Sequence, residues 1–152
     1  MKISFLHFLI LVLAVTMTSC RKEFPNDPID IRNLSVSGCK TNGSRSNGIY
    51  PEYITIKTVD DYYLLINHIN SMLNCEPGEI SVSLENISLD KISCDENESS
   101  SLANCICPYD IEFKLGPLEY STYTILFKKG GLTFKELYLS FNKSTDIKIY
   151  IQ

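Results

Sequence analysis

Residues 104–123 read NCICPYDIEFKLGPLEYSTY and combine two cysteines, an alternating segment and a turn. From 110 to 115, apolar and charged residues alternate strictly, which is the pattern of a β-strand with one face in the core and one in water. Gly116-Pro117 then ends the strand, because proline cannot donate a hydrogen bond to a sheet. Alternation resumes after the turn, so this region predicts strand, turn and strand.

Similar short segments follow one another from residue 53 onward, separated by turn sequences rich in Gly, Asn and Pro. The strands that we expect are 53–58, 60–74, 80–85, 86–92, 111–115, 120–127, 132–141 and 147–151. About seven or eight short strands at this spacing predict an all-β fold made of a single β-sandwich. With 152 residues, 44% of them hydrophobic, the chain is long enough for one such domain and too short for two.

The segment 60–74 fits two interpretations. A helix would place an apolar stripe on one side and Asp60 at its N-cap, whereas a strand would place Leu64, Ile66 and His68 on one face. The segment is rich in Tyr, Ile and Asn, which form helices poorly, and it contains no Ala, Glu or Lys. Its neighbours all read as strands, so we interpret it as a strand.

The N-terminus has the features of an export signal. A short basic start precedes an apolar run from 3 to 15, which is shorter than the roughly 20 residues that span a bilayer. The run ends in TMTSC at 16–20, and the small residue before Cys20 resembles the lipobox of bacterial lipoproteins. The resemblance implies that a signal peptide, 1–19, is removed and that Cys20 carries acyl chains such as palmitate. The alternative is ordinary secretory cleavage, which would leave Cys20 free or in a disulfide.

Lipidation of Cys20 makes the membrane the expected partner of the mature protein, since two or more acyl chains anchor stably where one binds only marginally. Arg21 after the cysteine resembles lipoproteins that are not held in the inner membrane, so we expect a lipid-anchored protein of the cell envelope, in the outer membrane. The formal charge of −4 and the scattered Lys and Arg residues give no basic surface for nucleic acid.

Residues 20–49 show no sustained periodicity and are rich in Pro, Gly, Ser and Asn. This composition predicts a flexible linker that holds a domain formed by 50–152 off the membrane surface. The alternative is a short strand around 31–36 that joins the edge of the domain. In that case the domain boundary lies anywhere between residues 29 and 50.

Two sequence segments resemble known families. The segment LEYSTYTI at 118–125, followed by a glycine turn and an alternating strand, resembles prealbumin-like and other immunoglobulin-like modules, with Ser121 where those modules have Gly. NCEPG at 74–78 followed by CICPYD at 105–110 resembles small cysteine-containing lipoproteins of Bacteroidota, which are of unassigned function. These resemblances imply an immunoglobulin-like Greek-key sandwich on a lipid-anchored protein, and they imply no activity.

Six cysteines without paired C-x-x-C motifs predict disulfides in an oxidising compartment. Once Cys20 carries lipid, five remain: Cys39, Cys75, Cys94, Cys105 and Cys107. This odd number leaves one thiol over, and Cys39 is our choice because it lies in the predicted linker. We expect Cys94 to pair with Cys105 and Cys75 with Cys107, and the swapped pairing of the same four residues stays open.

The sequence contains no catalytic signature and predicts neither a metal nor a cofactor. His68 is the single histidine of the mature chain, and a cysteine hydrolase would need a free thiolate beside it, which disulfides disfavour. Cys105-x-Cys107 lacks the C-x-x-C spacing of redox motifs, so a structural role is favoured. The acidic segment 95–101 reads as a solvated loop, and its alternative, a calcium site, lacks the D-x-D-x-D-G spacing.

Two functions fit this sequence. The first is a non-catalytic binding or structural module that recognises a protein or glycan, which nine tyrosines favour because Tyr supplies rigid contact area. The alternative is a small envelope enzyme whose site is built from loops. A pocket that gathers His68 or several carboxylates would favour the enzyme.

Overall fold

The computed structural model describes residues 24–40 and 51–151, apart from the side chain of Asn86. The predicted signal peptide, 1–19, and the predicted lipidation site, Cys20, lie outside the described residues. Within them the secondary structure is entirely β, and no helix is present that could cross a bilayer. The strands are β1 (Asp30–Val36), β2 (Tyr53–Val59), β3 (Tyr63–Asn74), β4 (Ile80–Ser88), β5 (Lys91–Glu98), β6 (Ile106–Gly116), β7 (Thr122–Lys129), β8 (Leu132–Ser140) and β9 (Asp146–Tyr150).

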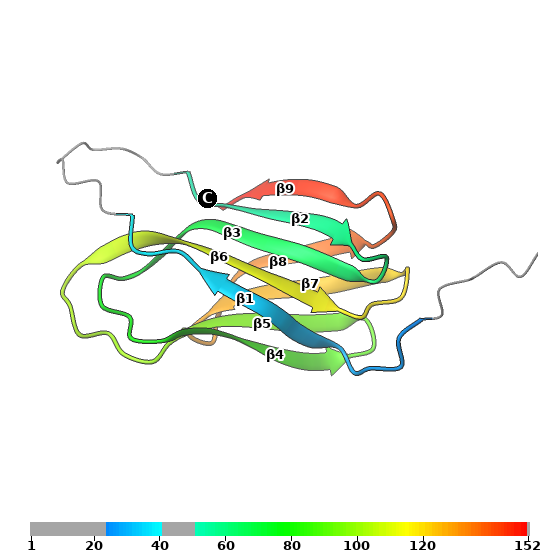
Figure 1. Ribbon diagram of the computed structural model, residues 1–152, viewed down its shortest axis with the longest axis horizontal. Helices are drawn as coiled ribbons and strands as arrows, with labels where there is room; N and C mark the ends of the chain where they lie inside the picture. The colour runs from blue at the N-terminus through cyan, green and yellow to red at the C-terminus, as the bar shows by residue number, and fades with distance from the viewer. Residues whose placement is uncertain (1–23, 41–50, 152) are drawn as a thin grey trace, which may run out of the picture.

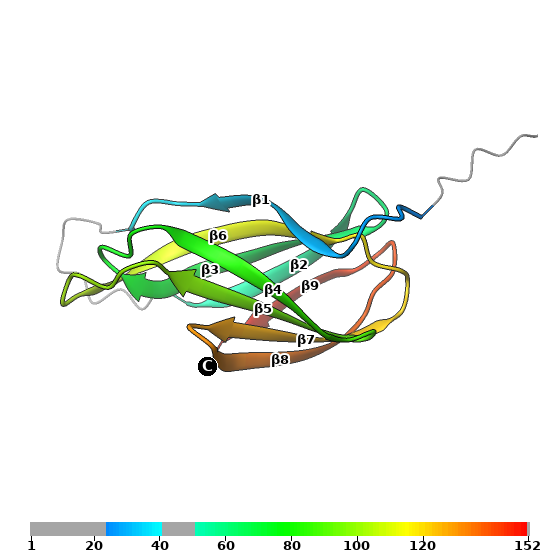
Figure 2. The ribbon, with the colours of Figure 1, turned by 90° about the horizontal axis from the view of Figure 1, so that it is seen from below.

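The strands form two sheets that pack face to face (Figures 1 and 2). The five-stranded sheet has the order β1-β6-β3-β2-β9 and is antiparallel throughout. The four-stranded sheet has the order β4-β5-β7-β8, in which β5 and β7 run parallel. The predicted all-β sandwich is therefore confirmed. The described residues contain nine strands rather than seven or eight, because β1 lies in the predicted linker.

The core lies between the sheets, and strand alternation decides which side chains enter it. On β6, Ile111, Phe113 and Leu115 are buried, as their spacing predicts. Ile92 of β5 and Ile125 of β7 join them from the four-stranded sheet. Because burying one such side chain contributes about 1.5–3 kcal/mol, these positions hold the inner face of β6 against the four-stranded sheet.

The strand interpretation of 60–74 is confirmed, because β3 occupies Tyr63–Asn74. Leu64, Ile66 and His68 are all buried on its inner face. β3 pairs with β2 on one side and with β6 on the other, so it is fully enclosed in the five-stranded sheet. β3 thereby places His68, the one histidine of the described residues, in the space between the sheets.

The turn after β6 forms where Gly116-Pro117 predicts it. Gly116 has a φ of 151°, and a Cβ atom added there would lie 2.6 Å from the carbonyl oxygen of Tyr62. The N–H of Leu118 donates to the same carbonyl at 2.7 Å. Only glycine allows the backbone to come so close, so this turn fixes the end of β6 against the start of β3.

β1 corrects the predicted linker, 20–49, and the predicted domain start at residue 50. β1 pairs antiparallel with β6, and its residues Ile31 and Val36 pack against the core. The described residues 24–40 therefore belong to the domain, as the alternative boundary allowed. The register of β1 shifts near Asn33, whose φ is 56°. This bulge interrupts the alternation, which is why the sequence shows only a weak strand pattern there.

β5 also corrects a prediction, because it extends through residue 98 into the acidic segment 95–101. Alternation continues along the strand, and Ile92, Cys94 and Glu96 are all buried in the core. The solvated-loop interpretation is therefore wrong for residues 95–98. A carboxylate in the core needs a partner. The partner of Glu96 is His68, and the two residues belong to a cluster that links the sheets.

Candidate functional site

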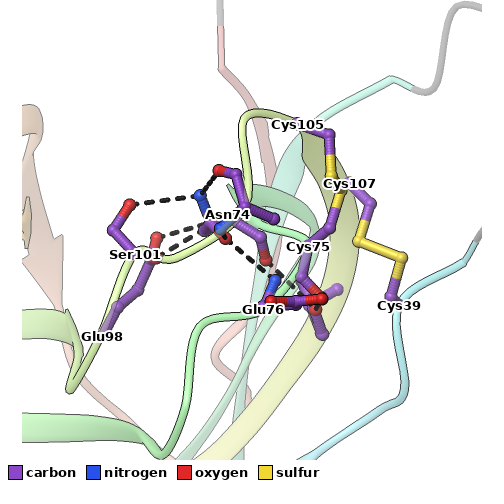
Figure 3. Close-up of a disulfide and its surroundings, with 10 residues drawn as sticks. Cys39, Asn74, Cys75, Glu76, Glu98, Ser101, Cys105 and Cys107 are labelled. Carbon is purple, nitrogen blue, oxygen red and sulfur yellow. Dashed lines mark hydrogen bonds between the residues drawn. A yellow bond between two sulfur atoms is a disulfide. The ribbon is translucent and has the colours of Figure 1, made fainter.

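Two disulfides connect three neighbouring strands at one end of the sandwich (Figure 3). Cys75, just after β3, is bonded to Cys105, just before β6, and the Cys75 N–H donates to the Cys105 carbonyl at 3.1 Å. Cys39, beyond β1, is bonded to Cys107 of β6. Because β6 lies between β1 and β3, its two cysteines reach one neighbour on each side.

These bridges correct the predicted connectivity. Of the two pairings left open by the sequence, only the Cys75–Cys105 bridge of the swapped pairing is present. Cys39 is bonded rather than free, and Cys94 is the free cysteine of the described residues. Cys94 is buried on β5 in the four-stranded sheet, and both Cys105 and Cys107 are already bonded to other cysteines.

The loop between β5 and β6 is held against β3 by Asn74 (Figure 3). Its Nδ2 donates to the Ala103 carbonyl at 2.6 Å and to Ser101 Oγ at 3.1 Å. Its Oδ1 accepts from the backbone N–H of Ala103 at 3.2 Å and of Glu76 at 2.9 Å. The backbone N–H of Asn74 donates to the Glu98 carboxylate at 3.2 Å. The amide of Asn74 is fully used, so Asn74 shapes this end of the domain rather than offering groups to a ligand.

An open groove of about 690 Å³ lies over this loop, and we call it the end groove. Its lining residues are Met72, Leu73, Asn74, Glu98, Ser101, Leu102, Ala103, Asn104, Cys105 and Ile106. Three large apolar side chains in it are exposed: Met72 by 41%, Leu102 by 80% and Ile106 by 67%. Such gathered apolar exposure beside polar groups is typical of a surface that binds a partner.

A second cluster lies inside the same end and links the two sheets. His68 Nδ1 of β3 lies 2.6 Å from Glu96 Oε1 of β5 in a hydrogen bond. His68 Nε2 lies 2.9 Å from Glu52 Oε1 in an ion pair. Ser71 Oγ donates to Glu96 Oε2 at 2.9 Å, and Lys129 Nζ donates to Glu52 at 3.2 Å. We call these five residues the buried charge network.

The buried charge network favours the imidazolium form of His68. Burial alone lowers the pKa of His68, but its contacts with Glu52 and Glu96 outweigh burial, so the pKa is raised. For Glu52 the two effects have the opposite signs. Burial raises the pKa of its carboxyl group, but the contacts with His68 and Lys129 outweigh burial, so the pKa is lowered. His68 is 1% exposed, and the ring of Phe134 stacks on it at 5.2 Å. The imidazole is therefore closed to a substrate.

The free thiol of Cys94 is not activated by this network. Burial and the neighbouring Glu96 raise its pKa to about 12, so it holds almost no thiolate near neutral pH. The cysteine hydrolase considered from the sequence requires a reactive cysteine beside His68. The free cysteine of the described residues, Cys94, is not reactive in this sense. Within the same residues, no group of three or more His, Cys, Asp or Glu side chains is placed to hold a metal ion.

The structure gathers three of the four predicted disulfide cysteines, Cys75, Cys105 and Cys107, at the end of the sandwich that carries the end groove, and places Cys94 on β5. Of these cysteines only Cys105 lines the groove. Cys39 and Glu96 are site residues that the sequence reasoning missed. One signal could have revealed Glu96. It lies two residues after Cys94 on β5, and alternation places both side chains on the buried face of the strand. Comparison of the chain with protein-family models, with curated proteins and with solved structures finds no match.

Proposed function

We propose that this protein is a lipid-anchored lipoprotein of the cell envelope, that its sandwich is a non-catalytic binding module, and that the end groove is the recognition surface. The lipobox-like sequence before Cys20 supports the anchor. The observation that carries the binding role is the exposure of Met72, Leu102 and Ile106 on an end that two disulfides hold in one shape. A surface that is already ordered loses little conformational freedom on binding.

The lining of the end groove favours a protein segment over a glycan as the partner. Its side chains are aliphatic, sulfur-containing or small and polar, and no aromatic ring lines it on which a sugar could stack. Glu98 gives it one carboxylate, so apolar side chains flanked by a basic residue are the chemistry that fits. The polar edge formed by Ser101 and Asn104 can exchange hydrogen bonds with a backbone.

Photo-crosslinking in intact cells tests this proposal. A photoreactive amino acid replaces Leu102 in the end groove or, as a matched control, Leu132. Leu132 is similarly exposed at the start of β8, at the same end of the sandwich but outside the groove. We expect a discrete protein adduct from position 102 that Ile106→Asp abolishes, and none from position 132. Adducts of equal yield from both positions, or none from 102, would contradict the binding role of the groove.

One observation favours the alternative, a small envelope enzyme. A pocket of about 260 Å³ is lined by Glu96, Glu98 and Lys129, so carboxylates and an amine converge beside the buried charge network. If this pocket is an enzyme site, the protein should turn over chromogenic ester, amide or glycoside substrates. Glu98→Gln should then abolish the turnover and leave the fold intact. The binding module predicts no turnover that depends on Glu98.

A further inference from the structure

Leu89 is the most exposed large apolar side chain of the described residues, at 98%. It lies in the turn between β4 and β5, and Ile87 near the end of β4 is also exposed. A fully exposed leucine at a hairpin tip has no packing role in the domain. It is suited to contact an apolar phase outside the protein.

Leu89 shares one end of the sandwich with the first described residues. A cavity of about 490 Å³ is lined by Phe24, Leu89 and Pro117 among others, so the chain enters the domain beside the hairpin tip. Pro117 follows β6, whereas the end groove lies at the beginning of β6. β6 has 11 residues. At a rise of about 3.3 Å per residue, the two ends of the sandwich are therefore about 35 Å apart. In Figure 1, β1 begins and β4 ends on the same side of the molecule.

The chain between Cys20 and the domain is short. The ring of Phe24 packs edge-on against that of Tyr62 at 5.1 Å, so Phe24 already belongs to the folded domain. Only four peptide steps separate it from Cys20. Fully extended, four residues span at most about 14 Å. A lipid on Cys20 would therefore hold this end of the sandwich within reach of the phospholipid headgroups, whatever conformation the intervening residues adopt.

We infer that the end carrying Phe24 and Leu89, here called the tether end, rests on a phospholipid surface with Leu89 at headgroup depth, so that the end groove faces away from the membrane. This inference rests on the proposed lipidation of Cys20 and adds an orientation to it. Apolar side chains placed at this depth strengthen the hold of an acyl anchor. The orientation leaves the end groove about one sandwich length from the bilayer, free to meet a partner.

The charges that line the tether end do not supply the attraction. Asp90 and Glu119 line the cavity there and would be repelled by anionic lipids, and the third carboxylate of the lining, Asp27, is paired with Arg32 at 3.0 Å. The contact therefore depends on the acyl chains and on Leu89. Zwitterionic phosphatidylcholine is accordingly the surface on which the inference is tested.

The chain contains no tryptophan, so one introduced Trp reports a single position. Leu89→Trp probes the tether end, Leu102→Trp the end groove, and Tyr138→Trp the exposed face of β8, where the native side chain is 74% exposed. Each full-length, lipidated variant is reconstituted on phosphatidylcholine vesicles, with or without bromine on the acyl chains near the headgroups. We expect bromine to quench most of the Trp fluorescence at position 89, with a blue-shifted emission, and little at positions 102 and 138.

The outcomes separate the two proposals. Variants that fail to float with vesicles contradict the lipid anchor and, with it, the orientation. Variants that float but show equal quenching at all three positions, strong quenching at 138, or no quenching at 89 overturn the orientation alone. Leu89→Ser should still float through its acyl chains, but it should be released by a lower detergent concentration than the wild type. Unchanged release would also overturn the contact of Leu89 with lipid.

Discussion

His68 makes the stability of the domain depend on pH. Its pKa is raised in the fold, because its contacts with Glu52 and Glu96 outweigh the effect of burial. The unfolded value is about 6.5, so its stabilising effect is fully present below that pH and is lost as pH rises through the raised folded pKa. We expect the urea midpoint of the wild type to fall as pH rises above about 6.5. His68→Gln should remove this fall and lower the stability by about 3–5 kcal/mol, because Glu96 loses its charged partner.

Ser93→Ala is the matched control for His68→Gln. The hydroxyl of Ser93 is buried on β5 and has no hydrogen-bond partner among the described residues. Alanine should therefore keep the pH dependence and equal or exceed the wild-type stability, since an unpaired buried hydroxyl costs about 1–3 kcal/mol. If His68→Gln retained the wild-type pH profile, the buried charge network would not be its source.

Gly116 is a second residue whose replacement has a defined consequence. Gly116→Ala places a Cβ atom 2.6 Å from the Tyr62 carbonyl at a φ of 151°, so we expect a loss of about 1–3 kcal/mol. Gly38→Ala is the control, because no atom lies within 4 Å of the added Cβ atom. It should change the stability by less than about 0.5 kcal/mol. Thermal unfolding of the two variants is followed by circular dichroism. Equal melting temperatures would show that the turn at Gly116 adjusts to the added Cβ atom without loss of stability.

At the scale of elements, the two disulfides stabilise the pairing of β6 with both neighbours. Each should contribute about 2–4 kcal/mol by restricting the unfolded chain. Cys39–Cys107 spans 68 residues and Cys75–Cys105 spans 30. Removing the longer bridge should therefore cost about 0.7 kcal/mol more, from the dependence of loop-closure entropy on length. For each bridge, a variant with both of its cysteines replaced by alanine is unfolded in urea, and the loss in free energy of unfolding is compared between the two variants.

Non-reducing peptide mapping provides the check on connectivity. Cys94→Ala should leave both bridges unchanged, because Cys94 is a free thiol on the other sheet. A peptide that links Cys94 to any of the other four cysteines would show that the strands are arranged differently.

A further prediction concerns the removal of β1. A chain that begins at residue 50 lacks β1 and the Cys39–Cys107 bridge, so one edge of β6 is left unpaired. Open strand edges pair with other chains. We therefore expect this shortened chain to melt earlier than one beginning at residue 24 and to form dimers or aggregates in size-exclusion chromatography. Equal melting and a monomeric profile would mean that β1 adds nothing to the fold.

Strand positions were more predictable than strand partners. Alternation indicated β2 to β9, but it divided β4 from β5 near residue 85 instead of after Ser88, and it ended β5 too early. It offered β1 only as an alternative, because the bulge at Asn33 breaks the pattern. No local signal states that β5 and β7 run parallel or that β6 crosses to the other sheet. Those pairings are set by long-range packing. For this reason the sequence identified the disulfide cysteines in part but joined them wrongly.

At the scale of the whole molecule, the anchor can be tested without knowing a partner. Cys20→Ala should abolish incorporation of labelled palmitate and shift the protein out of the outer-membrane fraction, because no acyl chain is attached. Cys94→Ala is the control, since it removes the one free thiol of the described residues and should leave labelling unchanged. Palmitate retained in Cys20→Ala would contradict the lipoprotein proposal.

The two candidate regions differ in how far a sequence can reveal them. His68 stood out because it is the single histidine after the predicted signal peptide, but its carboxylate partners come from β5 and from the residue before β2. The end groove combines the end of β3, at 72–74, with the connection from β5 to β6, at 98–106, and β4 and most of β5 separate these two segments in the chain. Its exposed apolar residues looked like ordinary loop and strand positions until the fold brought them together.

The bridge between Cys39 and Cys107 also limits how the domain responds to mechanical force. A pull applied through the N-terminus would first separate β1 from β6, one hydrogen bond at a time, because β1 is an edge strand next to the point of loading. Separation would stop at Cys39, which is covalently held to β6. The released segment from Phe24 to Cys39 would then span at most about 54 Å. Further load would then pass through the bridge into β6, which is paired with β3 on its other side.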